Sequence, residues 1–167
     1  VLYNSWYATT FNVNEQQQEA LAKQAKDIGV EMFVIDDGWF KGRINDKIGL
    51  GDWEVDKIKF PNGLSPLIKK INDMGMQFGL WIEPEMVNPK SELYQKHPDW
   101  VVKENKRDEY YFRNQLVLDL SNPKVQDFVY GIVDDLFTKN PELAYIKWDC
   151  NAVIYNAHSA YLKNQSH

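Results

Sequence analysis

The chain has 167 residues, 44% of them hydrophobic and 26% charged, which suits one globular domain with a real core. Its net charge of −5, without a basic cluster, gives little support for nucleic-acid binding, and no apolar run approaches the roughly 20 residues of a membrane span. The single cysteine, Cys150, excludes an internal disulfide.

The first part of the chain predicts two strands with a helix between them. Residues 3–11 are rich in aromatic and β-branched types and predict a strand near 3–8. Asn14 predicts the N-cap of a helix, and Gly29 predicts its end. The apolar run at 31–36 predicts the second strand.

Helices and strands continue to alternate after a polar and aromatic segment at 40–63. Apolar residues at helical spacing from Val125 to Leu136 give the clearest helix in the chain, which Pro141 ends. The remaining predicted elements are, in chain order, a helix at 65–74 with Pro66 at its first position, a strand at 77–82, a short helix at 91–97, an extended segment at 100–119, the helix from 122 and a strand at 144–148.

The alternating order predicts an α/β fold with a parallel sheet and right-handed crossovers. Two architectures compete, an open doubly wound sheet and a (β/α)8 TIM barrel. No strand-to-helix loop carries a Gly-rich phosphate fingerprint, which weakens the nucleotide-binding version of the open sheet. Four strands are half a barrel, since a complete one needs roughly 250 residues.

Polar and aromatic residues stand where the predicted strands end. They are Asp36 and Asp37 after the second strand, Trp81 and Glu83 at the end of the third, and Lys147 and Asp149 at the end of the fourth. Because the carboxyl ends of parallel strands share one face, we expect these side chains to meet there, where barrel enzymes keep their chemistry.

Asp149 is the leading candidate for a nucleophile or base. Lys147 lies two residues away on the same side of the strand and favours the ionised carboxylate. The alternative is an ion pair that ties down a loop. Glu83 and Glu85 form a second pair, which would supply an acid or else anchor Lys147 or a backbone turn.

Asp36 and Asp37 suit sugar hydroxyls, which donate hydrogen bonds in defined directions. Metal ligation has little support because the three histidines lack ligand spacing, and capping or turn roles are the alternative. Arg113 would fix a hydroxyl or carboxylate, or would be solvated. Three tryptophans beside the polar groups suggest stacking on a pyranose, although core packing explains each one separately: Trp39, Trp81 and Trp148.

Six motifs together resemble the α-galactosidases of glycoside hydrolase family 36, the melibiase-like enzymes. They run in order through nearly the whole chain: "DDGWF" at 36–40, "GDWEVDKIKFPNGL" at 51–64, "GLWIEPEMV" at 79–87, "HPDW" at 97–100, "RNQLVLDLS" at 113–121 and "KWDCN" at 147–151. Any one motif is weak, but six at family-like spacing are specific.

The resemblance implies that residues 1–167 are the N-terminal half of a (β/α)8 catalytic barrel, without its second half and its flanking β-domains. It implies retaining hydrolysis of terminal α-galactosides such as melibiose and raffinose, with an α-galactoside oligosaccharide as partner and without metal or other cofactor. By the same resemblance Asp149 matches the nucleophile. The galactose-binding set is matched by Asp36, Asp37, Trp81, Arg113, Lys147 and Asn151.

The chain departs from the family pattern in two ways. Cys150 and Ala152 stand where the family often has Met and Arg, which bears on fine specificity. The family's acid/base is an Asp downstream of a Gly-rich segment, and the chain stops before either, so we expect the piece itself to be inactive.

Several alternatives stay open. They are an α-N-acetylgalactosaminidase, a galactosyl-transferring raffinose synthase-like enzyme, the neighbouring family 27, and a non-catalytic galactose-binding fragment. The chain begins without an initiator Met or a signal-peptide pattern, which indicates an excised piece and favours a cytoplasmic protein. For the full-length parent we expect a homo-oligomer.

Overall fold

The computed structural model describes residues 1–164, and its main sheet has four parallel strands in the order β1-β2-β3-β6. These strands are β1 (Leu2–Asn4), β2 (Met32–Ile35), β3 (Gln77–Ile82) and β6 (Leu143–Trp148). A second, antiparallel sheet pairs β4 (Met86–Val87) with β5 (Leu116–Val117). The predicted α/β class and the parallel pairing are therefore confirmed.

Three of the five helices in the described part of the chain begin at a side-chain N-cap. The five helices are α1 (Trp6–Thr9), α2 (Glu15–Asp27), α3 (Ser65–Asp73), α4 (Glu92–Lys96) and α5 (Pro123–Lys139). The side chains of Asn14, Ser91 and Asn122 each accept a hydrogen bond from a first-turn backbone N–H of α2, α4 and α5. Of these helices only α1 was not predicted, and none is long and apolar enough to cross a bilayer.

The strand predicted at 3–8 is wrong beyond Asn4. The Asn4 Oδ1 atom accepts a hydrogen bond from the backbone N–H of Trp6 at 2.9 Å, and the Ser5 carbonyl accepts the N–H of Thr9 at 3.0 Å. Short polar side chains that bond to nearby backbone compete with strand pairing, so the chain turns into α1.

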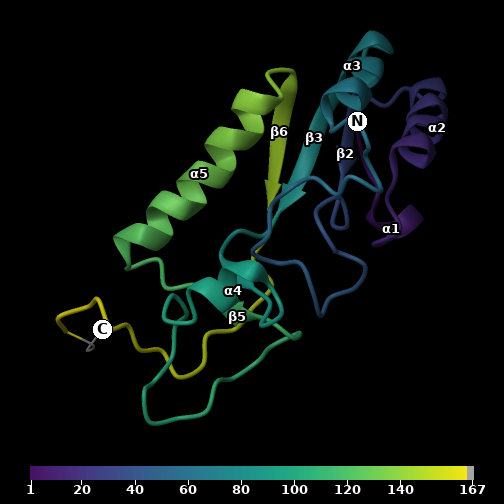
Figure 1. Cartoon of the computed structure of the whole chain (residues 1–167). Helices are drawn as coiled ribbons and strands as arrows, with labels where there is room; N and C mark the ends of the chain where they lie inside the picture. The colour runs from purple at the N-terminus through teal and green to yellow at the C-terminus, as the bar shows by residue number, and fades with distance from the viewer. Residues whose placement is uncertain (165–167) are drawn as a thin grey trace.

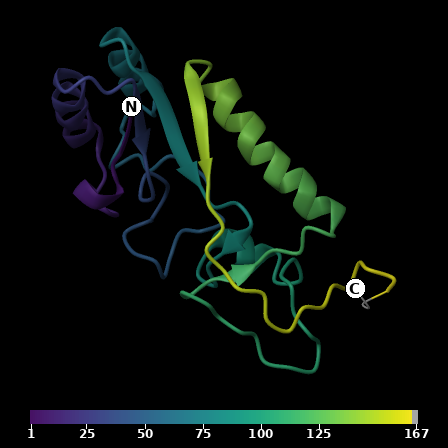
Figure 2. The same cartoon turned by 180° about the vertical axis from the view of Figure 1, so that it is seen from behind.

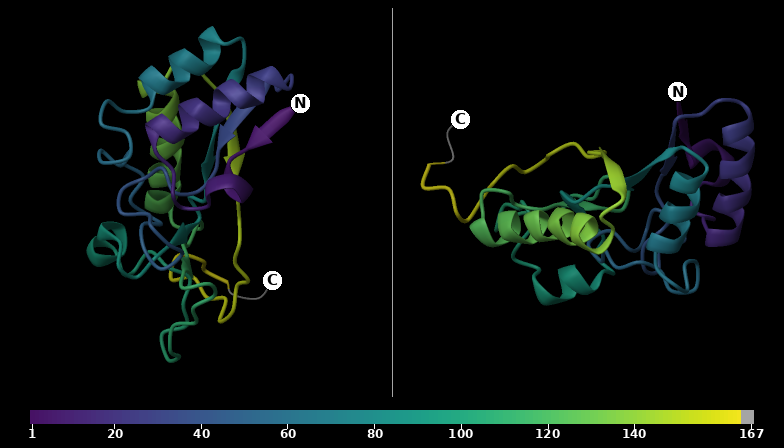
Figure 3. Two further views of the ribbon diagram at one scale, coloured as in Figure 1. Left: turned by 90° about the vertical axis from the view of Figure 1, so that its right-hand side faces the viewer. Right: turned by 90° about the horizontal axis from the view of Figure 1, so that it is seen from above.

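One face of the main sheet packs against helices and contributes to the core. Figure 3 shows α2, α3 and α5 on one side of the sheet. Phe33, Ile35, Phe78 and Leu80 belong to the core cluster that also holds the apolar residues of α3, and all four are fully buried. Side chains alternate along a strand, so residues one step out of phase with these lie on the other face.

The carboxyl ends of the strands lie together at one end of the molecule. In Figure 1 the arrows of β3 and β6 point toward the end that holds α4, β4 and β5. After β6 the chain runs past that same end, as Figure 2 shows from behind. Loops from three parts of the chain therefore surround the strand ends.

Candidate active site

A cavity of about 140 Å³ opens at the carboxyl ends of the strands. It brings together the predicted nucleophile and the whole predicted galactose-binding set, namely Asp149 with Asp36, Asp37, Trp81, Arg113, Lys147 and Asn151. It is also lined by Glu83, which the sequence offered as an acid or an anchor, and by residues that the sequence did not single out, namely Trp6, Arg43, Asp46 and Gln115. The expected convergence at this end of the strands is thus observed.

Asp36 joins the ends of three strands. Its Oδ2 atom accepts hydrogen bonds from Lys147 Nζ at 2.6 Å and Asn4 Nδ2 at 2.7 Å, and its Oδ1 atom accepts the backbone N–H of Asp37 at 2.8 Å. Asp36 is buried, whereas 38% of the Lys147 side chain is exposed. The direct partner of Lys147 is therefore Asp36 rather than Asp149.

Asp37 is held by an arginine that sequence reasoning missed. Arg43 Nε and Nη2 donate to its two carboxylate oxygens at 2.9 and 2.7 Å, a bidentate pair in which both residues are buried. Burial raises the pKa of Asp37, and the Arg43 guanidinium acts in the opposite direction. Arg43 sits in the polar segment after "DDGWF", where no periodicity marks its side chain as buried.

The loop that carries Asp37 and Arg43 is held in place by hydrogen bonds from the Lys59 side chain to backbone carbonyls. Lys59 Nζ donates to the carbonyl oxygens of Phe11, Gly38 and Arg43 at 3.0, 2.6 and 2.8 Å. Gly38 has a φ of +109°, and a Cβ there would lie 2.9 Å from the Phe11 Cα. Only glycine fits both the conformation and the close approach, which explains the third position of "DDGWF".

Asp149 lies directly after β6, and its carboxylate accepts two hydrogen bonds. Trp81 Nε1 donates to its Oδ2 at 3.0 Å and the Cys150 backbone N–H donates to its Oδ1 at 3.0 Å, while the Asn151 side chain also acts to lower its pKa. Partial burial acts to raise the pKa of Asp149, but these donors and the charge of Lys147 outweigh it and lower the pKa. The carboxylate is thus held ionised, mainly by hydrogen bonds.

Of the three tryptophans expected to stack on a sugar, only Trp81 lines the cavity. Trp39 is fully buried in the core and donates from Nε1 to the Trp81 carbonyl at 2.8 Å. Trp148 is 45% exposed and donates to Glu85 Oε1 at 2.9 Å. Core packing and a surface contact therefore account for Trp39 and Trp148.

Glu83 and Arg113 occupy different depths of the same cavity. Glu83 is 2% exposed, and its Oε1 atom accepts the Asn151 backbone N–H at 2.6 Å. It therefore anchors backbone, one of the roles predicted for it, and burial raises its pKa. Arg113 is exposed, with a φ of +51°.

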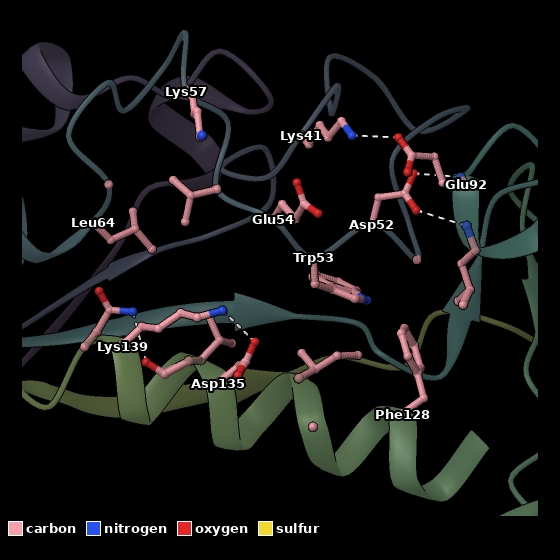
Figure 4. A pocket seen from close by; sticks show the side chains of 18 of the residues that line it. Lys41, Asp52, Trp53, Glu54, Lys57, Leu64, Glu92, Phe128, Asp135 and Lys139 are labelled. Atoms are coloured by element: carbon pink, nitrogen blue, oxygen red, sulfur yellow. Dashed lines mark hydrogen bonds and ion pairs between the residues drawn. The ribbon is translucent and has the colours of Figure 1, made fainter. Parts of the chain in front are cut away.

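A larger hollow of about 900 Å³ lies apart from this cavity, between the loop at 51–65 and α5. Figure 4 shows Trp53 and Phe128 in its wall and two ion pairs beside it, Lys41 with Glu92 and Lys139 with Asp135. None of the site residues predicted from the sequence, all of them within the described part of the chain, lines this hollow. The predicted nucleophile and galactose-binding residues therefore lie at the smaller cavity.

The arrangement suits a polyhydroxylated ligand next to the Asp149 carboxylate. Carboxylates accept from hydroxyl groups, the Lys147 ammonium and the Arg113 guanidinium donate to them, and an indole offers an apolar edge. Within residues 1–164 no group of three His, Cys, Asp or Glu side chains is placed to hold a metal ion.

Comparison with known proteins identifies the family. The Melibiase family model matches residues 1–167. The curated α-galactosidase AgaA of Geobacillus stearothermophilus is 47% identical over 151 residues, which are 90% of this chain and 21% of that protein. The chain thus spans about one fifth of the length of such a relative.

Solved structures give the same result. The family 36 α-galactosidase AgaB of Geobacillus stearothermophilus matches with a TM-score of 0.93 and 46% identity, over 97% of this chain and 22% of that one. The α-galactosidase of Lactobacillus brevis matches with a TM-score of 0.94 and 44% identity, over 98% and 22%. Variants of AgaA have been solved in complex with stachyose and with raffinose. Sequence and structure together place this chain in the melibiase family.

Proposed function

We propose that this chain is the N-terminal half of the (β/α)8 catalytic barrel of a retaining α-galactosidase. The four parallel strands, with α2, α3 and α5 on one side, suit half a barrel. The observation that carries the proposal is the cavity in which an ionised Asp149 faces the same space as the Asp36–Lys147 pair. The relatives of known structure, AgaA in complex with raffinose and stachyose among them, support an α-galactoside as the substrate.

In this proposal Asp149 attacks the anomeric carbon from the face opposite the leaving group and forms a β-linked galactosyl-enzyme. Asp36 and Asp37 accept hydroxyl hydrogens, while Lys147, Arg113 and Asn151 donate to hydroxyl oxygens. The Trp81 ring supports the sugar and its N–H keeps the nucleophile ionised.

A retaining glycosidase needs a second carboxyl group about 5–5.5 Å from the nucleophile, first as acid and then as base. We assign that group to the remainder of the enzyme, beyond the residues of this chain. It protonates the departing oxygen and then activates water, so that the α configuration is retained. The 167-residue piece alone is then inactive toward unactivated substrates such as raffinose.

The test is a proton NMR time course of raffinose hydrolysis by the full-length enzyme that contains this chain. The proposal predicts α-galactose as the first product, with β-galactose appearing only by mutarotation. Asp149→Ala is expected to lose turnover while still binding 1-deoxygalactonojirimycin, a ligand solved in complex with an AgaA variant. β-Galactose as the first product, or wild-type turnover by Asp149→Ala, overturns the proposal.

A further inference from the structure

The segment that carries the nucleophile leaves the sheet at a defined point. The backbone N–H of Asp149 still donates to the Ile82 carbonyl at 2.8 Å, which continues the pairing of β6 with β3. From residue 149 onward the chain has no regular secondary structure up to residue 155. Something other than strand pairing must therefore hold Asn151, the neighbour whose side chain acts to lower the pKa of Asp149.

Two buried side chains form hydrogen bonds to the main chain of Asn151, one to its N–H and one to its carbonyl oxygen. Glu83 Oε1 accepts its N–H at 2.6 Å, and Gln115 Nε2 donates to its carbonyl oxygen at 3.3 Å. Gln115 Nε2 also lies 3.4 Å from Glu83 Oε1, so the two side chains support one another. Glu83 is 2% exposed and Gln115 is 4% exposed, which limits their freedom to move.

Glu83 and Gln115, with the Asn151 main chain that they hold, form what we call the clamp. Its residues come from three distant parts of the sequence. Glu83 directly follows β3, Gln115 directly precedes β5, and Asn151 follows the nucleophile. The Asn151 side chain acts to lower the pKa of both neighbouring carboxyl groups, Asp149 and Glu83. A shift of the Asn151 backbone would therefore move a donor away from the Asp149 carboxylate.

We propose that Glu83 and Gln115 are positioning residues, which fix Asp149 through the backbone and side chain of Asn151. This inference rests on the proposed function, because it assigns Asp149 the role of nucleophile. A competing role for Glu83 is that of a general acid, since it is a buried carboxyl group in the cavity. The geometry favours positioning, because the Oε1 atom is committed to a backbone N–H at 2.6 Å.

Replacing Glu83 by Ala and by Gln separates these roles in the full-length enzyme. Both changes remove the carboxyl group, but only Ala removes the acceptor for the Asn151 N–H. Positioning predicts that Glu83→Ala loses about 100-fold in kcat on both raffinose and p-nitrophenyl α-galactoside, the size expected for a misplaced reacting group. Glu83→Gln should recover at least about ten-fold of that loss on both substrates.

The pH profile adds a readout that a purely structural role would not move. With the clamp gone, Asp149 loses the Asn151 donor, so its pKa rises and the acidic limb of kcat/KM moves to higher pH in Glu83→Ala relative to Glu83→Gln. Gln115→Ala should act in the same direction. The double change Glu83→Ala with Gln115→Ala should cost less than the sum of the two, because both act on Asn151.

Glu142→Ala is the matched control, since Glu142 is exposed and lies before β6, away from the cavity. It should keep the wild-type kcat and pH profile. Loss of raffinose hydrolysis in Glu83→Gln with aryl galactoside hydrolysis retained would identify an acid and overturn the inference. So would wild-type kinetics in Glu83→Ala. If Asp149→Ala itself stays active, the proposed function has failed rather than the clamp alone.

Discussion

The adjacent residues Asp36 and Asp37 have different ion-pair partners, and these partners rather than their neighbours in sequence distinguish the two carboxylates. Asp36 is paired with an ammonium that is partly exposed to the cavity, whereas Asp37 is locked in a buried bidentate pair with Arg43. Sequence alone predicts that both lie at a strand end, since that follows from the pattern of the strand. It cannot predict Arg43 as the partner, because the irregular loop that delivers Arg43 has no periodic pattern.

The Arg43 pair makes a strong prediction for stability. Arg43→Met leaves the buried Asp37 carboxylate unpaired and should destabilise the full-length protein by about 3–5 kcal/mol. Lys41→Met is the matched control, because Lys41 and Glu92 form an exposed pair, and it should cause little change. Urea unfolding of both variants checks this, and equal effects would contradict it.

Trp81 helps to keep the proposed nucleophile ionised. The lowered pKa of Asp149 keeps it ionised to low pH, and the Trp81 N–H contributes to that lowering. Trp81→Phe removes the donor, so the pKa of Asp149 should rise and activity should be lost at a higher pH as the solution is acidified. The measurement is the acidic limb of kcat/KM in the full-length enzyme. Trp148→Phe, which removes an indole N–H that bonds to Glu85 instead, should leave the limb in place.

At the scale of elements, most of the fold could be predicted because the sequence carries clear signals for where helices start and where strands run. N-cap side chains and prolines set the helix starts, and three of the four parallel strands lie where apolar runs predicted them. The error at 3–8 came from weighing aromatic residues more heavily than the turn-forming Asn4 and Ser5. The sugar-binding expectation for Trp39 and Trp148 failed because proximity in sequence does not fix the direction of a ring.

β3 lies between β2 and β6, and its Gly79 leaves little room for added bulk. At Gly79 a Cβ would lie 2.8 Å from Tyr145 Cδ1 and 3.0 Å from Val34 Cγ2. Gly79→Ala should therefore destabilise the full-length protein by about 1–3 kcal/mol.

A second glycine provides the comparison for that change. Gly131 lies in α5 with open space around its Cα, so Gly131→Ala should stabilise by about 0.5–1 kcal/mol through helix propensity. Urea unfolding of the two variants should shift in opposite directions. A shift of the same sign in both would mean that close packing at β3 is not the cause.

At the scale of the whole molecule, the main sheet of the described residues 1–164 is not closed and has two edges. β1 and β6 are its edge strands, and Leu2, Tyr145 and Trp148 on them are more than a third exposed. Unpaired strand edges and exposed apolar side chains favour association. Half a barrel would present these features where the missing strands belong.

The isolated 167-residue chain should therefore self-associate or aggregate. Sedimentation velocity across a range of concentrations should show species larger than the 19.6 kDa monomer, and a hydrophobic dye should bind. A monomer at all concentrations with a sharp cooperative melt would contradict the assignment of these strands as open edges.

The most direct test of the central claim is azide rescue of Asp149→Ala in the full-length enzyme with p-nitrophenyl α-galactoside. Removing the carboxylate leaves space on the face of the sugar opposite the leaving group, where azide can attack in its place. The account predicts that azide restores release of p-nitrophenol and that NMR identifies the product as β-galactosyl azide. α-Galactosyl azide as the product would show attack from the other face and would contradict Asp149 as the nucleophile.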